Sequence, residues 1–407
     1  MKITRIIHPI GQGGFYSETL KEGGQEITVV YDCGGNSKPF MENYLENYFP
    51  KIDEKPTKKK NDKKESKKTI DAVFISHMHE DHVNGLDYLL NQFHVRYLIL
   101  PRLSEDEKLE AFIYNYLKNP ESIGNELIRD LYTRDSYYYL NSRTRVITVP
   151  YNDNLTDEGN ELLQIEFNNQ HDLDLTIDEE NTKISFLSPG SKVHFREKWV
   201  YIPFNPPIKR KQDVSFYDFL KDRLSLRDFT IKDLPDIIEK QGVKRCKKVY
   251  TDYFGEDHNS YSMTVFSGVL RDDEMMSFIK CSGRKLNQKR RYPPRCPHYD
   301  NWACLNPNCL YMGDFETKDY MKLLQRFYRP LWDKIGQVQV PHHGSGYNHK
   351  DDLYEFAELG FISVGEENSY HHPNIDTLMG IKEMACRPIL VTENMSTIKV
   401  FHATDER

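Results

Sequence analysis

The sequence of 407 residues contains no run of about 18 apolar residues, the length that a membrane-spanning helix requires. Its first residues, MKITR, also lack the long apolar stretch of a secretory signal peptide. These absences predict a cytoplasmic protein that makes no membrane contact. In that reducing compartment the seven cysteines are expected to be free or metal-bound rather than paired in disulfides.

Several common architectures and chemistries are also missing. No internal repeat of about 20–50 residues is present, which excludes solenoids and propellers. Residues 11–14 (GQGG) are not followed by a helix that starts with Lys and Ser or Thr, so they form no phosphate-binding P-loop. No G-x-S-x-G element that would carry a serine nucleophile occurs.

Positive charge is scarce outside one segment. The formal net charge is −7, yet residues 55–68 carry eight lysines against two acidic residues, so the remainder is strongly acidic. Such a protein does not attract polyanions through its overall field. Contact with nucleic acid would therefore depend on local basic patches or on a metal site.

What the sequence does contain is an alternation of buried strands and amphipathic helices. Apolar runs predict strands near residues 3–7, 26–31, 70–76, 95–100, 145–149, 163–167, 183–187, 261–269, 338–340, 361–364, 389–392 and 398–401. Helices are predicted at 39–48, 83–93, 104 to about 116, from 320 onward and at 374–384. This alternation predicts a layered α/β architecture.

The densest group of metal-ligand side chains, HMHEDH at residues 77–82, follows a predicted buried strand directly. Residues two apart in an extended turn point the same way, so His77 and His79 can bind one metal ion. Asp81 and His82 begin the next helix and can face a second ion. Imidazoles and carboxylates suit zinc or manganese. The alternative, a surface turn that is rich in histidine by chance, does not account for this spacing after a strand.

This motif resembles the HxHxDH signature of the metallo-β-lactamase superfamily. Two earlier segments, GQG at 11–13 and DCG at 32–34, resemble the opening of its ComEC-type branch, the domain attached to competence DNA-uptake channels. Further resemblances follow in the same order along the chain: LSP at 187–189, MGD at 312–314, VPHHGS at 340–345, SVG with Asn368 and His372-Pro373, and, only loosely, VTEN at 391–394.

The resemblance implies an αββα sandwich of two sheets with metal ions at one edge. It also implies a single domain over residues 1–407 whose excess length lies in three insertions. These are a Lys-rich loop at 50–69, an aromatic and basic subdomain at 190–250, and a Cys-rich basic insertion at 271–308.

Metal-binding roles follow from the same resemblance. It implies two zinc or manganese ions, the first held by His77 and His79, the second by Asp81 and His82, with Asp314 bridging both. Asp32 is expected to orient a histidine ligand rather than to bind metal itself.

Three further histidine positions remain open. One of His342 and His343 is expected to reach the metals, and the sequence does not decide which. His372 could be a ligand or a contact to the leaving group. His258 could complete the first metal site or be a loop histidine without a role.

Two groups of residues lie outside this pattern. A structural zinc could stabilise the third insertion, because four cysteines gather in a segment too small to form its own core; the alternative is coincidental free thiols. The cysteines are Cys281, Cys296, Cys304 and Cys309. Basic residues interleave with an aromatic at 284–295 and lie beside aromatics at 209–211, as in surfaces that bind phosphates and stack bases, although both could equally be solvated loops. The candidate contacts are Lys289, Arg290, Arg291, Lys209 and Arg210.

These features predict a binuclear metal-dependent phosphodiesterase, a nuclease on DNA or RNA, in which a hydroxide between the metals attacks phosphorus. Asp81 and Asp314 would hold the metals, and His342, His343 or His372 would stabilise the leaving oxygen. One alternative is a hydrolase of a small phosphodiester or other ester, similar to phosphorylcholine esterases or cyclic-nucleotide phosphodiesterases. Another is a non-catalytic binding module, against which the intact ligand set argues. The sequence identifies no protein partner.

Overall fold

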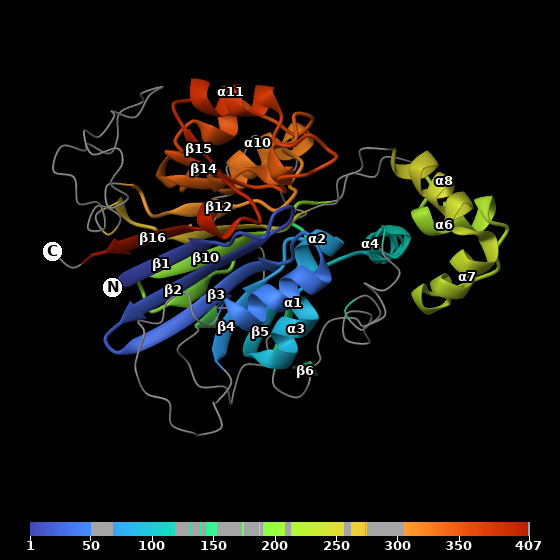
Figure 1. The fold of residues 1–407 in the computed structure, drawn as a ribbon, viewed down its shortest axis with the longest axis horizontal. Coiled ribbons are helices and arrows are strands. Elements are labelled where there is room, and N and C mark those ends of the chain that lie inside the picture. Colours follow the sequence, from blue (N-terminus) through green and yellow to red (C-terminus); the bar gives the residue numbers. More distant parts are fainter. Residues whose placement is uncertain are drawn as a thin grey trace.

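The computed structural model describes residues 1–49, 68–118, 131, 139–140, 144–152, 173–174, 187, 190–207, 213–255, 262–272, 274 and 305–405. Within them, the strands form two sheets of eight strands each. Helices cover the outer face of each sheet (Figure 1). No helix in these ranges is both long enough and apolar enough to cross a membrane.

The first sheet contains both ends of the described chain. Its strand order is β16 (Lys399–Thr404), β1 (Lys2–Ile7), β2 (Phe15–Glu22), β3 (Gln25–Cys33), β4 (Thr69–Phe74), β5 (His94–Pro101), β7 (Thr144–Val149) and β6 (Tyr139–Leu140). From β3 to β7 neighbouring strands are parallel, whereas β16, β1, β2 and β3 pair antiparallel. Helices α1 (Lys38–Asn47) and α3 (Leu86–Gln92) pack on its outer face.

The second sheet is built from the rest of the chain. Its order is β15 (Arg387–Val391), β14 (Leu359–Ser363), β13 (Gln337–Gln339), β12 (Cys309–Tyr311), β11 (Thr264–Gly268), β10 (Trp199–Phe204), β9 (Val193–Phe195) and β8 (Leu173–Asp174). Strands β12 to β15 are parallel neighbours. Helices α10 (Thr317–Phe327) and α11 (Ile375–Glu383) cover its outer face.

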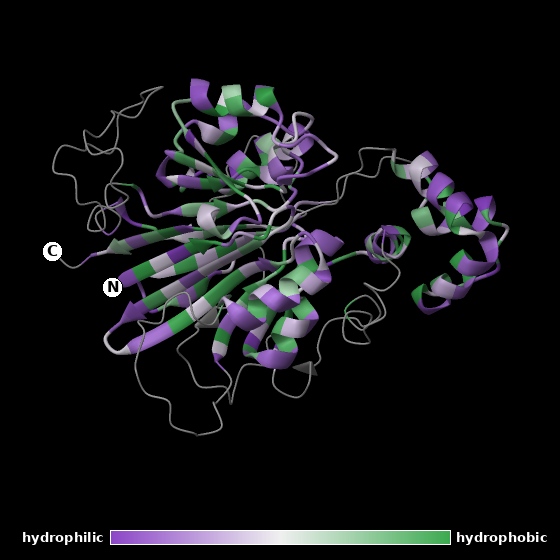
Figure 2. Ribbon diagram, in the orientation of Figure 1, coloured by the Kyte–Doolittle hydropathy of each residue, from purple (hydrophilic) through white to green (hydrophobic). Residues whose placement is uncertain are grey.

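Three hydrophobic cores separate the four layers. Along β4, Val73 contributes to the core beneath α1 and α3, while Ala72 and Phe74 contribute to the core between the sheets. Both faces of this strand are buried, which explains why its sequence is apolar apart from Thr69 and Asp71. A third core joins the second sheet to α10 and α11. Hydrophobic residues accordingly lie along the strands, and the outer helices contain both hydrophobic and hydrophilic residues (Figure 2). The predicted αββα sandwich is confirmed.

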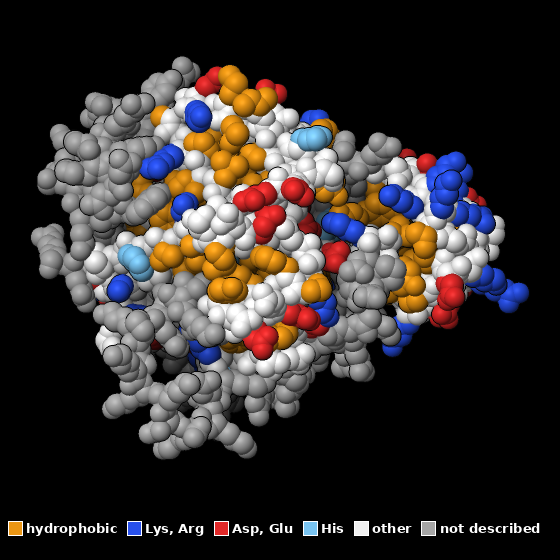
Figure 3. Space-filling view, in the orientation of Figure 1, with side chains coloured by type: hydrophobic (Ala, Val, Ile, Leu, Met, Phe, Trp, Pro, Cys, Tyr) orange, Lys and Arg blue, Asp and Glu red, His pale blue; other side chains and the backbone are white. Residues whose placement is uncertain are grey.

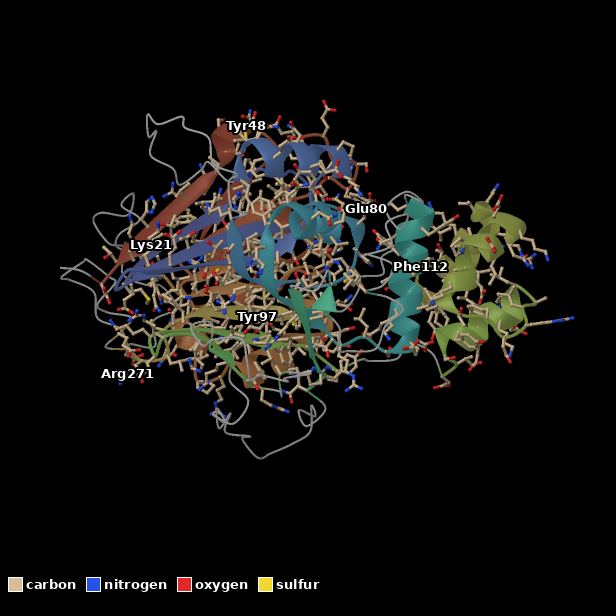
Figure 4. The ribbon with its side chains drawn as sticks, turned by 90° about the horizontal axis from the view of Figure 1, so that it is seen from below. Lys21, Tyr48, Glu80, Tyr97, Phe112 and Arg271 are labelled. Carbon is tan, nitrogen blue, oxygen red and sulfur yellow. The ribbon has the colours of Figure 1, made fainter. Side chains whose placement is uncertain are left out.

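Three helices between β10 and β11 form a separate module, residues 213–255: α6 (Phe216–Arg223), α7 (Leu234–Gln241) and α8 (Val243–Phe254). The module packs against α4 (Glu105–Lys118), and its core merges with the one beneath the first sheet. Figure 4 shows Phe112 of α4 facing these helices. The side chain of Phe112 is fully buried.

The structure places the start of this module later than the sequence predicts. Residues 193–204, expected in an aromatic and basic subdomain, are β9 and β10 of the second sheet. Trp199 and Tyr201 face the core between the sheets, whereas Ile202 and Phe204 face the outer core. Alternate residues of β10 face two different cores, and the residues on both sides are apolar or aromatic. The sequence therefore shows no alternation of apolar and polar residues that would indicate a strand.

The helix expected at 83–93 is interrupted. It becomes α2 (Glu80–Val83) and α3, with Asn84 and Gly85 between them. The Asn84 side chain donates to the Gly35 carbonyl oxygen at 2.7 Å and accepts from the Gly35 N–H at 3.1 Å. The Gly85 N–H donates to the Cys33 carbonyl oxygen at 2.9 Å. These bonds to the loop after β3 turn the backbone away from a single continuous helix. The expected strand at 163–167 lies outside the described residues.

At the start of α4, the expected capping box is present. The Ser104 N–H donates to Glu107 Oε2 at 2.7 Å, and the Glu107 N–H donates to Ser104 Oγ at 3.3 Å. The Tyr151 hydroxyl also donates to the Glu107 carboxylate. Burial raises the pKa of Glu107 from 4.5 to about 7 despite these bonds.

Glu107 is expected to make the protein less stable as pH rises from about 4.5 to 7, because the folded state then binds a proton that the unfolded state has lost. A Glu107→Gln variant stays neutral and should lose this slope, gaining up to about 3 kcal/mol relative to wild type across that range. Urea unfolding measured between pH 4.5 and 7.5 tests this. Glu105→Gln, which removes an exposed carboxylate of the same helix, is the control. Equal slopes for wild type and Glu107→Gln would contradict the prediction.

Candidate metal centre

The candidate ligands lie where strands end at one edge of the sandwich. β4 leads into the turn that carries His77, β12 leads into Asp314, and β13 leads into His342 and His343. Because β12 and β13 are parallel neighbours, their carboxyl ends meet at the same edge. The Met263 N–H donates to the Ser76 carbonyl oxygen at 2.7 Å, which joins the two sheets beside this turn.

Asp314 lies at the middle of the group. Its Oδ1 is 3.2 Å from His82 Nε2 and 3.7 Å from His343 Nε2, and its Oδ2 is 3.8 Å from His77 Nε2. Two sets of three residues offer ligand atoms, and within each set these atoms lie within 4.8 Å of one another. The first set is His77, His82 and Asp314, and the second is Asp81, His82 and His343. His82 belongs to both sets, and the two carboxylate oxygens of Asp314 face different histidines.

The donor atoms in this group fit a divalent metal ion. Within the described part of the chain, the Nε2 atoms of His77, His82 and His343 and the Oδ1 atom of Asp314 are buried without a hydrogen bond. Each unsatisfied buried polar group costs about 1–3 kcal/mol, so four that converge on one point require a common partner. Imidazole nitrogen and carboxylate oxygen are the donors that zinc and manganese accept.

Contacts at the opposite ring nitrogen orient each of these histidines. His77 Nδ1 is 2.9 Å from Ser76 Oγ and 3.2 Å from Ser262 Oγ. His343 Nδ1 is 2.9 Å from the carbonyl oxygen of Ser363. With Nδ1 engaged, Nε2 is directed at Asp314. Such outer contacts set the tautomer and the ring orientation of metal-binding histidines.

Asp32 provides the same contact for His82. Its Oδ2 is 2.8 Å from His82 Nδ1, and it also accepts from the Ser76 hydroxyl at 2.8 Å, while Oδ1 accepts from the Ser76 N–H at 2.7 Å. Asp32 is fully buried and has a φ of 57°. The structure therefore places Asp32 behind a histidine, with no atom in the two ligand sets.

Glycines allow the loops after β1 and β3 to approach the histidine turn closely. A Cβ on Gly14 would lie 2.8 Å from both Asp32 Oδ2 and His82 Nδ1, and a Cβ on Gly34 would lie 2.3 Å from the Asp81 carbonyl oxygen. The Gly14 N–H donates to that same oxygen at 3.1 Å. The GQGG and DCGG segments thus hold the histidine turn in place.

An Asp32→Asn substitution is expected to weaken metal binding about 10- to 100-fold, because His82 would lose the carboxylate that orients it. Competition with a fluorescent chelator measures this affinity. Asp71→Asn is the control, since Asp71 is another buried carboxylate of the first sheet, bonded to Thr28 and Arg96 away from the centre. An unchanged affinity in Asp32→Asn, with the fold intact by circular dichroism, would contradict the assignment.

Neighbouring charges keep two of the groups in the state that binds metal. Burial would raise the pKa of Asp314, but the surrounding His82, His342 and His343 outweigh it and hold this pKa well below its usual range. Burial, together with the nearby His82 and His79, holds the pKa of His77 well below 6.5. The carboxylate is therefore ionised and this imidazole neutral at neutral pH.

The remaining histidines surround the inner group. The side chain of His343 is 4% exposed and that of His342 24%, and His342 Nε2 is 3.9 Å from Asp314 Oδ2. His372 lies beside His342, with ring centroids 5.6 Å apart. The geometry thus favours His343 over His342 for the inner group and places His342 and His372 at its rim.

His79 lies on the α4 side of the centre. Its ring stacks on Tyr114 with centroids 3.9 Å apart, and its Nε2 is 3.6 Å from Glu110 Oε1. The Tyr250 hydroxyl of α8 donates to the same Glu110 oxygen at 2.6 Å. Glu110 and Tyr114 were missed by the sequence analysis, although with Lys118 they recur every fourth residue on one face of α4, a spacing that could have grouped them.

A cleft of about 460 Å³ opens onto the centre. Asp81, Asp314, His342, His343 and His372 lie along its floor and one side. Lys118 of α4 and Lys247 of α8 lie along the other. Burial would lower the pKa of Lys118, but Asp81, Tyr114, Tyr370 and Glu80 together outweigh it and raise this pKa, so the ammonium group stays charged.

Several predicted residues lie outside the described ranges, and their roles stay predictions. They are His258, Cys281, Cys296, Cys304, Lys209, Arg210, Lys289, Arg290 and Arg291. Cys309, the last candidate for a structural zinc, is a buried residue of β12 that faces the core between the sheets.

The basic segment 284–295 lies outside the described residues. In the sequence it comes between the end of β11 and the start of β12, whereas Asp314 follows the end of β12. Figure 4 shows Arg271, just after β11, and Glu80, in the histidine turn, at opposite ends of the sandwich. The two strand ends that flank the segment therefore lie at the edge opposite the metal centre.

The family model of the metallo-beta-lactamase superfamily matches residues 22–165, from the end of β2 to beyond β7. This match includes the histidine turn. With the αββα fold it confirms the predicted resemblance to this superfamily, and it indicates a metal-dependent hydrolase. The ComEC-type branch stays a prediction. No curated protein matches the chain significantly.

Proposed function

We propose that the protein is a metal-dependent phosphodiesterase with two zinc or manganese ions, and that it hydrolyses DNA or RNA. The observation that carries the proposal is the convergence of buried, unbonded imidazole and carboxylate atoms on Asp314. The two carboxylate oxygens of Asp314 face different histidines, which favours two adjacent ions over one. When bound, such ions supply Lewis-acid activation of water and of a phosphodiester.

The side chains of the protein would bind the metal ions, contact the leaving oxygen and hold the phosphodiester. Asp81, His82, His343 and Asp314 would hold one ion, and His77, His79 and Asp314 the other. His342 and His372, at the rim of the centre, are placed to donate an N–H to the leaving oxygen of a substrate in the cleft. Lys118 and Lys247 supply the positive charge that an otherwise acidic protein needs to hold a phosphodiester.

A second candidate is a hydrolase of a small ester or small phosphodiester. The size of the cleft favours it, since about 460 Å³ lies within the range of small-molecule sites. This candidate uses the same metal ligands and differs only in the substrate that the cleft admits.

Incubation with zinc or manganese and a panel of substrates tests the proposal. The panel contains single-stranded, duplex and circular DNA, RNA, and bis(4-nitrophenyl) phosphate. We expect cleavage of at least one nucleic acid, which chelation abolishes and added metal restores. Cleavage of the aryl ester alone would support the small-molecule hydrolase, and inactivity on every substrate would favour a binding module.

A further inference from the structure

The cleft has two unlike walls that arise far apart in the sequence. One wall consists of α4 and α8, which contribute Lys118 and Lys247. The other follows β13 and β14 and carries Tyr347 and Tyr370. A substrate that reaches the metal centre therefore passes between cationic side chains and tyrosines.

Both tyrosines are unusually open for large aromatic side chains: Tyr347 is 48% exposed and Tyr370 59%. Each ring is nevertheless held by a partner. The ring of Tyr370 lies parallel to that of His372, with centroids 5.8 Å apart and an interplanar angle of 15°. Lys318 Nζ lies 4.1 Å from the ring centroid of Tyr347. Fixed, exposed aromatic rings beside a cationic groove are the elements with which proteins bind unpaired bases.

The α4 and α8 side of the cleft is tied together by direct contacts, although α8 belongs to the helical module. The hydrogen bond from the Tyr250 hydroxyl to Glu110 joins α8 to α4, and the same Glu110 oxygen lies beside His79. Phe216 packs against Tyr253 and Phe254 behind it, with ring centroids 4.9 and 4.5 Å away. Lys247 lies three residues before Tyr250 and is thus held at the cleft. Lys and Arg side chains gather over this module in Figure 3.

We propose that the cleft binds single-stranded nucleic acid, with bases stacked on Tyr370 and Tyr347 and flanking phosphates held by Lys118 and Lys247. This inference rests on the proposed phosphodiesterase function and names its substrate class. The bases of a duplex are already stacked and paired, so they cannot reach the two rings. A cleft of about 460 Å³ is also of small-molecule size, which suits a strand that enters by one or two nucleotides.

Fluorescence anisotropy with a labelled 12-nucleotide single strand and the matching duplex tests the inference in EDTA, where no cleavage occurs. We expect the wild-type protein to bind the single strand at least tenfold more tightly than the duplex. Tyr370→Ala should weaken single-strand binding about tenfold, and Tyr370→Phe should retain it, because stacking needs the ring and not the hydroxyl. Tyr48→Ala is the control, since Tyr48 is a 42% exposed tyrosine directly after α1 that does not line the cleft.

The salt dependence of binding tests the lysine wall. Lys247→Ala should lower the slope of log Kd against log salt concentration by about 0.7, the value for one phosphate contact on a single strand. Lys244→Ala removes an exposed lysine of the same helix that does not line the cleft, and it should leave the slope unchanged.

The outcomes separate this inference from the proposed function. Tighter binding of the duplex, or equal losses in Tyr370→Ala and Tyr48→Ala, would overturn the inference whatever the activity. Hydrolysis of bis(4-nitrophenyl) phosphate without single-strand binding would overturn the inference and leave a phosphodiesterase. Single-strand binding that depends on Tyr370 and Lys247 would support the inference even in a protein that hydrolyses nothing.

Discussion

Replacement of Asp314 by asparagine is expected to abolish hydrolysis of every substrate, with kcat/KM reduced at least about 1000-fold. The two oxygens of Asp314 face His82 and His343 on one side and His77 on the other. An asparagine keeps the shape but offers one neutral oxygen, so the histidines on the two sides of Asp314 lose the anion between them. Steady-state kinetics with zinc and with manganese, together with metal analysis, measure the loss.

The matched control for this substitution is Asp319→Asn. Asp319 lies five residues later, in the exposed first turn of α10. We expect Asp319→Asn to retain its activity and its metal content. An Asp314→Asn protein that bound two metal ions and cleaved its substrate at the wild-type rate would show that the Asp314 carboxylate is not needed between the metal ligands.

Replacement of Arg5 by methionine is expected to lower the free energy of unfolding by about 3–5 kcal/mol. Arg5 of β1 lies opposite Glu18 of β2, and both side chains are buried, with an ion-pair distance of 2.7 Å. Arg5 also donates to Gln337 Oε1 at 2.9 Å, and Glu18 accepts from the hydroxyls of Tyr201 and Ser267 at 2.9 and 2.6 Å. These bonds cross between the sheets, so the loss of Arg5 leaves a buried carboxylate without its cation.

Urea unfolding of three variants tests the role of this ion pair. The control is Lys21→Met, because Lys21 and Glu26 form a solvent-exposed pair at 2.7 Å whose loss should cost less than about 1 kcal/mol. A double variant, Arg5→Met with Glu18→Leu, should recover part of the loss because it removes both charges. Equal losses for Arg5→Met and Lys21→Met would contradict the prediction.

The part of the metal centre that depends on local geometry could be predicted from the sequence. The turn at 77–82 follows a strand that is buried on both faces, and its ligands lie within six residues of one another. The spacing predicted that His77 and His79 lie together, and their ring centroids are 4.7 Å apart, whereas His82, expected at a second ion, lies equally close to His77, at 4.2 Å. The fold class was predictable for a similar reason, because apolar runs and amphipathic stretches alternate along most of the chain.

Other features could not be predicted because they depend on pairing between distant segments. His342 and His343 are adjacent and both have positive φ, at 48° and 53°, so no local pattern separates them. The contact of His343 Nδ1 with the Ser363 carbonyl oxygen, on a neighbouring strand, turns its Nε2 toward Asp314. The cleft wall likewise depends on the bond between Tyr250 and Glu110, which no sequence spacing relates.

By itself, then, the sequence determined the superfamily resemblance, the layered architecture and the histidine turn, since each follows from local periodicity or from residues close along the chain. Only the tertiary structure decided which strand ends meet. It placed Asp314 between His82 and His343 on one side and His77 on the other, and it brought Lys118, Lys247 and two exposed tyrosines to one cleft. It also placed the end of β11 and the start of β12, the strand ends that flank residues 284–295 in the sequence, at the far edge of the sandwich, because an antiparallel connection joins strands at the edge opposite the one where β12 ends.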